Sequence, residues 1–131
     1  MLLVYEGHPL FERQSVCLAD IRQEPIIMEG PDFAIYNHFR SRCIAQGFAP
    51  NIIVETGDIS FCHKLCEMKQ GLSLTVDFVA DIIQLPAVRA IPFSDADFVW
   101  TVSLVRPRNR AISSPAKLLH NYLLTRFRDK E

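Results

Sequence analysis

The chain has 131 residues, of which 49% are hydrophobic and 22% are charged, values that are ordinary for a globular protein and exclude a disordered one. Its formal net charge is -1, so the chain lacks the excess of basic residues that is typical of a nucleic-acid-binding domain. A chain of this length can bury roughly two-thirds of its unfolded surface, so it suits one domain without a disulfide framework.

Targeting signals are absent from the sequence pattern. No apolar run approaches the roughly 20 residues of a membrane span, so no membrane partner is expected. The apolar start at 1–5 meets Glu6 too early for a signal peptide. Cysteines stand at Cys17, Cys43, Cys62 and Cys66, and two of them lie on a predicted core stripe. Reduced thiols fit this placement better than bridges do, which predicts a cytoplasmic protein.

The first half of the chain predicts two strands and a helix. Residues 1–5 form the first strand, which a loop at 7–10 interrupts because proline restricts itself and its neighbour. After a possible helical turn at 15–21, residues 25–28 form the second strand, entered through a proline. A helix then starts at Asp32, its predicted cap, and ends at Gly47.

Residues 50–76 predict a complete strand, helix and strand, around which the rest of the chain is organised. The β-branched run at 52–54 predicts a strand buried on both faces, and Asp58 is placed to cap the following helix. That helix has an inward stripe at Ile59, Cys62, Leu65, Cys66 and Lys69. We expect Gly71 to end it through positive φ, and residues 72–76 to return parallel to the first strand.

The last third predicts a short helix, two strands and a long helix. Asp77 is expected to cap the short helix, whose Phe78, Val79, Ile82 and Ile83 face inward. The strands lie at 88–93 and 98–105, separated by turn-forming residues at 94–97. The long amphipathic helix has Ser114 as its cap and Pro115 at its first position.

This order of elements predicts a ligand-binding edge. Strands ending near Met28, Val54 and Val76 each lead into a helix, and parallel strands would open all three helices on one edge of the sheet. Helix N-termini favour anions through their free N–H groups. Because aspartates are placed to take up those donors, a strongly anionic ligand is disfavoured there.

Cys62, His63 and Cys66 offer three zinc ligands in principle. His63, however, projects about 100° away from Cys62 around a helix, and the cysteines coincide with the core stripe. Buried thiols therefore explain the pattern better than a metal site. A reactive Cys62 near the helix start remains an alternative, although Asp58 opposes a thiolate.

Carboxylates are the other candidates for chemistry. Glu29, Asp32, Glu55 and Asp58 could pair for general acid–base catalysis across the predicted edge. Capping and solvated strand ends explain them better. No catalytic constellation, metal or cofactor is therefore predicted.

Several motifs in this order resemble the effector-binding domain of LysR-type transcriptional regulators, from Leu2 to about Phe127. They include the tripeptide at 8–10, the turn and strand at 16–27, the segment 47–55 with its glycine, proline and strand, and the turn at 71–74. Ser114-Pro115-Ala116 opens a terminal helix as in the family. Ser73 replaces the second glycine of the family's turn.

The resemblance implies an α/β fold, a type II periplasmic-binding-protein-like subdomain with a Rossmann-like mixed sheet flanked by helices. The chain would be one partial domain, 1–131. Residues 1–106 would form the second regulatory subdomain with both crossover strands, at 2–5 and 100–105. Residues 107–131 would supply a C-terminal helix that packs on a first subdomain absent from this chain.

A role follows from the same resemblance. The chain would sense a small-molecule effector in a cleft between subdomains and so control transcription, without enzymatic activity. DNA would be bound only by a helix-turn-helix domain absent from this chain. Apolar surface expected to be exposed around Val99, Trp100 and Val102 and on the final helix predicts self-association, as a homodimer or higher homo-oligomer. The alternative is a fragment of a periplasmic-type solute-binding protein.

The resemblance also implies the effector-facing residues. They are Gly30, Pro31, Asp32, Thr56, Gly57, Asp58, Thr75, Val76 and Asp77. Aspartates stand here where the family often has serine or threonine, which points away from the usual carboxylate effector and toward a polar or cationic one.

Overall fold

The computed structural model describes residues 1–82, 85–96, 98–99, 101, 103–109 and 111–127. Two compact units make up the chain, residues 1–100 and residues 101–131. The elements of the first unit are β1 (Leu2–Tyr5), the 3-10 helix η1 (Leu18–Ile21), β2 (Pro25–Glu29), α1 (Ala34–Ala45), β3 (Asn51–Thr56), α2 (Ile59–Glu67), β4 (Leu72–Leu74), α3 (Asp77–Ala80) and β5 (Val88–Ile91).

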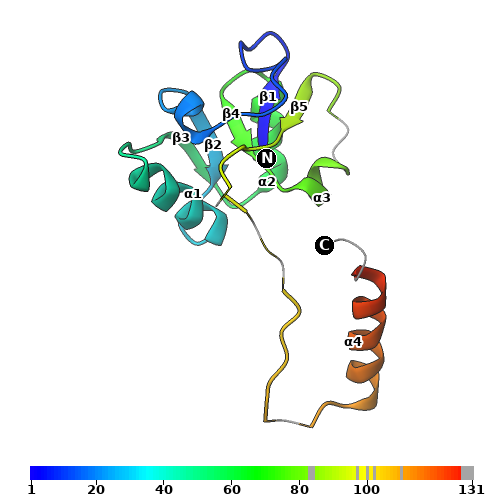
Figure 1. Cartoon of the computed structure of the whole chain (residues 1–131). Helices are drawn as coiled ribbons and strands as arrows, with labels where there is room; N and C mark the ends of the chain where they lie inside the picture. Colours follow the sequence, from blue (N-terminus) through cyan, green and yellow to red (C-terminus); the bar gives the residue numbers. More distant parts are fainter. Residues whose placement is uncertain (83–84, 97, 100, 102, 110, 128–131) are drawn as a thin grey trace. The chain divides into compact units, whose positions relative to one another are not determined.

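Five strands form one mixed sheet in the order β3-β2-β4-β1-β5. Strand β2 runs parallel to both β3 and β4, whereas β1 runs antiparallel to β4 and β5. The predicted parallel return through α2 is confirmed, because a helical crossover brings the chain back in the same direction. The α/β class with a mixed sheet is likewise confirmed (Figure 1).

Alternation along the strands divides the sheet into two packed faces. One face belongs to the main core, which contains Leu2, Val4, Ile26, Met28, Leu72 and Leu74 from the strands and Phe39 and Cys43 from α1. The other face lies against α2, which packs on β1, β2 and β4. There the buried Cys66 Sγ donates to the carbonyl oxygen of Leu3 at 3.4 Å.

Strand β3 is an edge strand, so the prediction that it is buried on both faces is wrong. Its residues alternate between exposed and half-buried, and Ile53 retains 48% exposure. A run of β-branched residues therefore marks a strand here without marking its position in the sheet.

Gly71 serves a different purpose from the one predicted. Helix α2 ends at Glu67, and Lys69 adopts the positive φ of 61°. A Cβ at Gly71 would lie 2.7 Å from the carbonyl oxygen of Pro25. Glycine is needed because the backbone before β4 approaches β2 closely. Gly47, in contrast, has a φ of 82° just after α1, as its predicted role requires.

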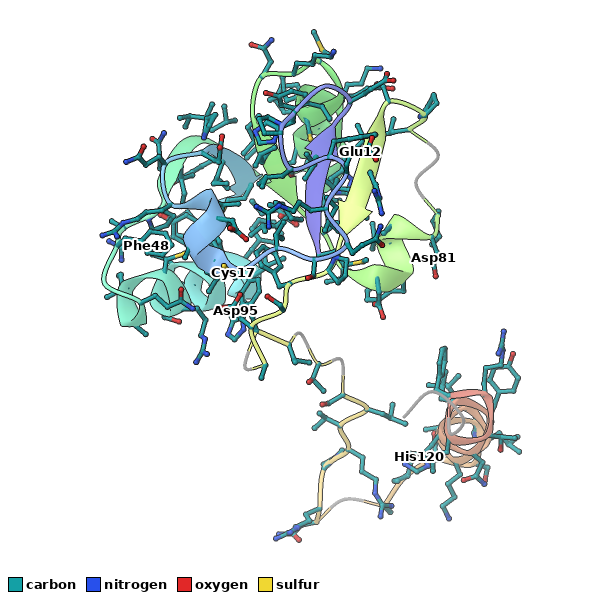
Figure 2. The ribbon with its side chains drawn as sticks, turned by 45° about the horizontal axis from the view of Figure 1, so that its top comes forward. Glu12, Cys17, Phe48, Asp81, Asp95 and His120 are labelled. Carbon is teal, nitrogen blue, oxygen red and sulfur yellow. The ribbon has the colours of Figure 1, made fainter. Side chains whose placement is uncertain are left out.

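Two loop residues tie the first unit together. The Nδ1 atom of the buried His8 accepts the Leu10 backbone N–H at 3.2 Å, and its Nε2 lies 3.3 Å from Glu24 Oε2, just before β2. Asp95, labelled beside Cys17 in Figure 2, accepts the Leu18 N–H at 2.9 Å and the Gln46 side-chain amide at 2.6 Å. The turn at 94–96 thereby joins η1 to the end of α1.

Helix α3 is shorter and more exposed than predicted. It ends at Ala80, and the side chains of Phe78 and Ile82 are 50% and 76% exposed. Ile83, also predicted to face inward, lies outside the described residues. With one helical turn, α3 is too short to present a sustained apolar stripe.

The second unit contains α4 (Ser114–Phe127), which confirms the predicted long helix. Its cap is one residue earlier than predicted, because Ser113 Oγ accepts the Ala116 N–H at 3.4 Å. No strand is present at 98–99, 101 or 103–105, and positions 100 and 102 lie outside the described residues. A strand requires a hydrogen-bonded neighbour, which none of the described residues provides at this segment.

Candidate functional site

The carboxyl ends of β2, β3 and β4 lie at one edge of the sheet because the three strands are parallel. All nine predicted effector-facing residues follow or end these strands. The Gly30 N–H donates to the Thr56 carbonyl at 3.0 Å, which brings the first two segments together. The predicted geometric relation between the three strand ends is therefore confirmed.

The segment 30–32 forms the entry to α1. Pro31 and Asp32 are exposed. The residue that caps α1 is Phe33, without a side-chain bond, so the prediction that Asp32 is the cap is wrong. Instead, Asn37 Nδ2 donates to the carbonyl oxygens of Pro31 at 2.8 Å and Phe33 at 3.3 Å. These two bonds from Asn37 hold the 31–33 backbone against α1. The Asp32 side chain is exposed and does not cap the helix.

The segment 56–58 forms the entry to α2 and matches its prediction. Asp58 Oδ1 accepts the backbone N–H groups of Ser60 at 2.8 Å and Phe61 at 3.3 Å. Thr56 Oγ1 accepts the Asp58 N–H at 3.3 Å. The aspartate therefore takes up two of the donors that would otherwise attract an anion.

The segment 75–77 joins β4 to α3. Thr75 is buried, and its N–H donates to the Met1 carbonyl at 3.0 Å. Val76 is the helix cap, so the prediction for Asp77 is wrong by one residue. The Asp77 carboxylate still accepts a first-turn donor, the Phe78 N–H, at 2.7 Å.

An open cavity of about 220 Å³ lies beside the last of these segments. Its lining residues are Met1, Ile35, His38, Leu74, Thr75, Val76, Asp77, Pro92, Phe93, Phe98 and Val99. Of the nine predicted residues, only Thr75, Val76 and Asp77 line it. The segments 30–32 and 56–58 lie at the same sheet edge but outside this cavity.

Aromatic side chains that the sequence reasoning missed form much of the cavity wall. Phe98 stacks on His38 with ring centroids 5.2 Å apart and meets Phe93 edge-on at 4.7 Å. The turn-forming residues between Phe93 and Phe98 in the sequence indicate that the chain reverses there, which could have predicted that the two rings meet. His38 lies on α1 and gave no comparable signal.

The cysteines on the two helices are buried thiols. Burial raises the pKa of Cys62 and of Cys66 to about 12, with the carboxylates of Glu29 and Asp58 also raising the pKa of Cys62. Burial likewise raises the pKa of Cys43 to about 11. A nucleophilic Cys62 would require the opposite shift, so the reactive-thiol alternative is not supported.

His63 is buried on α2, as the two cysteines are, but its ring nitrogen and the Cys66 thiol contact different carbonyl oxygens, those of Leu74 and Leu3. It is 2% exposed, and its Nε2 lies 3.4 Å from the Leu74 carbonyl oxygen. Burial lowers its pKa. Within the part of the chain that the structure describes, no group of three or more His, Cys, Asp or Glu side chains is arranged to hold a metal.

The four carboxylates at the edge have separate surroundings. Glu55 Oε1 accepts the Tyr36 hydroxyl at 3.0 Å, and Asp58 caps α2. Glu29 is buried, with no hydrogen bond to its Oε2 from any described residue. No described contact joins two of these carboxylates into an acid–base pair.

Comparison with known proteins gives a consistent family. Residues 1–128 match the model of the LysR substrate binding domain. The uncharacterised HTH-type transcriptional regulator YwbI of Bacillus subtilis (strain 168) is 27% identical over 117 residues, covering 89% of this chain and 39% of that protein. The transcriptional dual regulator GltC of the same organism is 23% identical over 125 residues, covering 95% of this chain and 42% of that protein.

Solved structures show the same fold. The effector-binding domain of QuiR in complex with shikimate has a TM-score of 0.72 and 17% identity, with 98% of this chain and 61% of that chain covered. The BenM effector-binding domain with its effector benzoate has a TM-score of 0.64 and 24% identity, with 74% of this chain and 45% of that chain covered.

The described helices include none that is both long and apolar enough to span a membrane. The chain spans about two-fifths of the length of the two Bacillus relatives. The family model matches nearly the whole chain and the solved structures share its fold, so the chain belongs to the LysR substrate-binding domain family, the effector-binding domain of LysR-type transcriptional regulators.

Proposed function

We propose that this chain is the second half of the effector-binding domain of a longer LysR-type regulator. Residues 1–106 would form the second regulatory subdomain, and α4, within 107–131, would pack on a first subdomain encoded outside this chain. The family match over nearly the whole chain, combined with coverage of only 39% to 42% of the Bacillus relatives, supports this division.

The effector would bind in the cleft between the subdomains, on the edge where β2, β3 and β4 end. This chain would contribute the nine residues of 30–32, 56–58 and 75–77. The observation that carries the proposal is the convergence of three parallel strand ends on this edge, beside a cavity lined by Thr75, Val76 and Asp77.

Effector binding would control transcription by changing the conformation of the regulator, without a chemical reaction of the effector. An effector that binds a closed cleft more tightly than an open one shifts the balance between them, and so the arrangement of the DNA-binding heads. The regulator would be a cytoplasmic homo-oligomer without enzymatic activity, binding DNA through a helix-turn-helix domain outside this chain. A solute-binding protein is disfavoured because the relatives described above are transcriptional regulators.

Ligand affinity measured with two versions of the protein tests this proposal. We would screen small molecules on the product of the complete reading frame, then titrate a ligand so found into both that product and the 131-residue chain by calorimetry. Because one cleft wall supplies only part of the contacts, the isolated chain should bind at least tenfold more weakly. Equal affinity would show that the cleft between subdomains is not the binding site.

A further inference from the structure

Glu29 occupies an unusual position for a carboxylate. It ends β2 at the ligand edge, is 7% exposed, and its Oε2 is buried with no hydrogen-bond partner among the described residues. Alternation along β2 places it on the face that α2 covers, opposite the core residues Ile26 and Met28. A buried carboxylate without a partner is costly unless a cationic or hydrogen-donating group meets it.

The neighbouring strand adds a second polar group on the same face. Ser73 of β4 pairs in register with Ile27, two residues before Glu29, and its buried Oγ also lacks a partner within the described chain. Polar groups on a sheet face that packs against a helix are normally satisfied. Glu29 lies at the end of the sheet where the proposed effector would enter, and Ser73 lies level with the middle of β2.

Negative charge predominates in the segments around Glu29, although the Met1 ammonium group donates to the Thr75 carbonyl oxygen at 2.7 Å and the Nε2 atom of the buried His63 lies 3.4 Å from the Leu74 carbonyl oxygen. Residues 29–32, 55–62 and 73–82 contain six carboxylates and no lysine, arginine or histidine. Asp58 Oδ1 accepts two backbone N–H groups at the start of α2, so the Asp58 carboxylate already occupies the position that an anionic ligand would take there. The carboxylates of Glu29 and Asp58 both add to the rise that burial causes in the pKa of the Cys62 thiol. Both carboxylates therefore lie near the start of α2.

We propose that the effector of this regulator is an organic cation whose ammonium, amidinium or guanidinium group is bound by Glu29. This inference rests on the proposed function and specifies the chemical class of its ligand. It separates this chain from the QuiR and BenM domains solved with shikimate and benzoate, which are both carboxylates. The guanidinium or ammonium N–H groups would donate to Glu29 Oε2, which has no hydrogen-bond partner among the described residues.

Minimal charged probes test the class of ligand independently of ligand shape. Methylguanidinium chloride and sodium acetate would each be titrated into the ¹⁵N-labelled 131-residue chain at constant ionic strength. Methylguanidinium should produce saturable shifts of the Gly30, Thr56 and Thr75 amide signals in the millimolar range. Acetate should leave these signals unchanged.

Substitutions separate binding at Glu29 from general attraction to an acidic surface. Glu29→Gln should weaken methylguanidinium binding at least tenfold, whereas Glu12→Gln, on an exposed loop residue labelled in Figure 2, should leave it unchanged. The comparison of methylguanidinium with acetate uses the unsubstituted chain, so this test does not depend on whether a variant folds.

Three results would overturn the cation site: no saturable response to methylguanidinium, an equal response in Glu29→Gln, or stronger binding of acetate. Preferential acetate binding at the same amides would contradict the cationic class alone and leave effector binding at this edge intact. Failure of the proposed function would appear in a different experiment, the calorimetric titration. There the complete protein and the 131-residue chain would bind the screened ligand with equal affinity.

Discussion

Gly71 lies where the backbone entering β4 comes closest to β2. A methyl group there would meet the Pro25 carbonyl oxygen at 2.7 Å and the Ile27 side chain at 3.1 to 3.2 Å. We therefore expect Gly71→Ala to lower the free energy of unfolding by about 2 kcal/mol, as overpacking in cores does. Urea denaturation would measure the loss. Gly57→Ala is the matched control, because nothing lies within 4 Å of its added Cβ; equal losses would contradict the close-approach explanation.

His63 makes stability depend on pH because burial lowers its pKa below the ordinary value of 6.5. The unfolded chain then takes up a proton before the folded chain does, so folding stability falls as pH drops below about 6.5. We expect His63→Gln to lose this component. Urea midpoints at pH 8 and pH 5.5 would show a smaller difference in the variant than in the unsubstituted chain. An identical difference would mean that other groups cause the acid sensitivity.

The helices α1 and α2 start with different side-chain capping. Asp58 accepts two backbone N–H groups there, whereas Asp32 stands one residue before an uncapped start of α1. We expect Asp58→Ala to cost about 1 kcal/mol of stability and Asp32→Ala less than about 0.5 kcal/mol. Thermal unfolding of the two variants measures the contrast. Similar losses would show that both aspartates contribute alike.

Much of the fold could be predicted from the sequence because local signals and packing agree there. Periodicity and turn residues predicted β2, α1, α2 and α4, and the helical crossover predicted that β4 runs parallel to β3. Both strands do run parallel to β2, which lies between them in the sheet. The caps of α1, α3 and α4 each differed from their predictions by one residue. The observed caps of α1 and α3, Phe33 and Val76, make no side-chain cap bond, so a search for polar caps does not find them. The segment 98–105 has β-branched residues but no described strand to pair with, which propensity alone does not reveal.

Prediction of the site was less complete. The three strand ends could be placed together because their direction follows from topology. The wall formed by Ile35, His38, Phe93 and Phe98 depends on how α1 packs near the end of β5, which has no local pattern. The unpaired state of Glu29 is likewise a property of packing around one carboxylate.

Helix α4 presents apolar side chains that no described residue covers. Leu118 and Tyr122, one turn apart, are 71% and 64% exposed. Apolar surface of this kind favours association, so we expect concentration-dependent self-association of the 131-residue chain in sedimentation velocity. The double variant Leu118→Glu with Tyr122→Glu should move the distribution toward monomer, whereas Lys117→Glu should not. A strictly monomeric species at high concentration would contradict this expectation.

We propose that this chain is one half of an effector-binding domain within a longer regulator. The most direct test is to sequence the native reading frame upstream of the codon for Met1. We predict that it encodes a helix-turn-helix domain followed by another α/β subdomain. A cleavable signal peptide, or a stop codon directly before a genuine start at Met1, would contradict the claim.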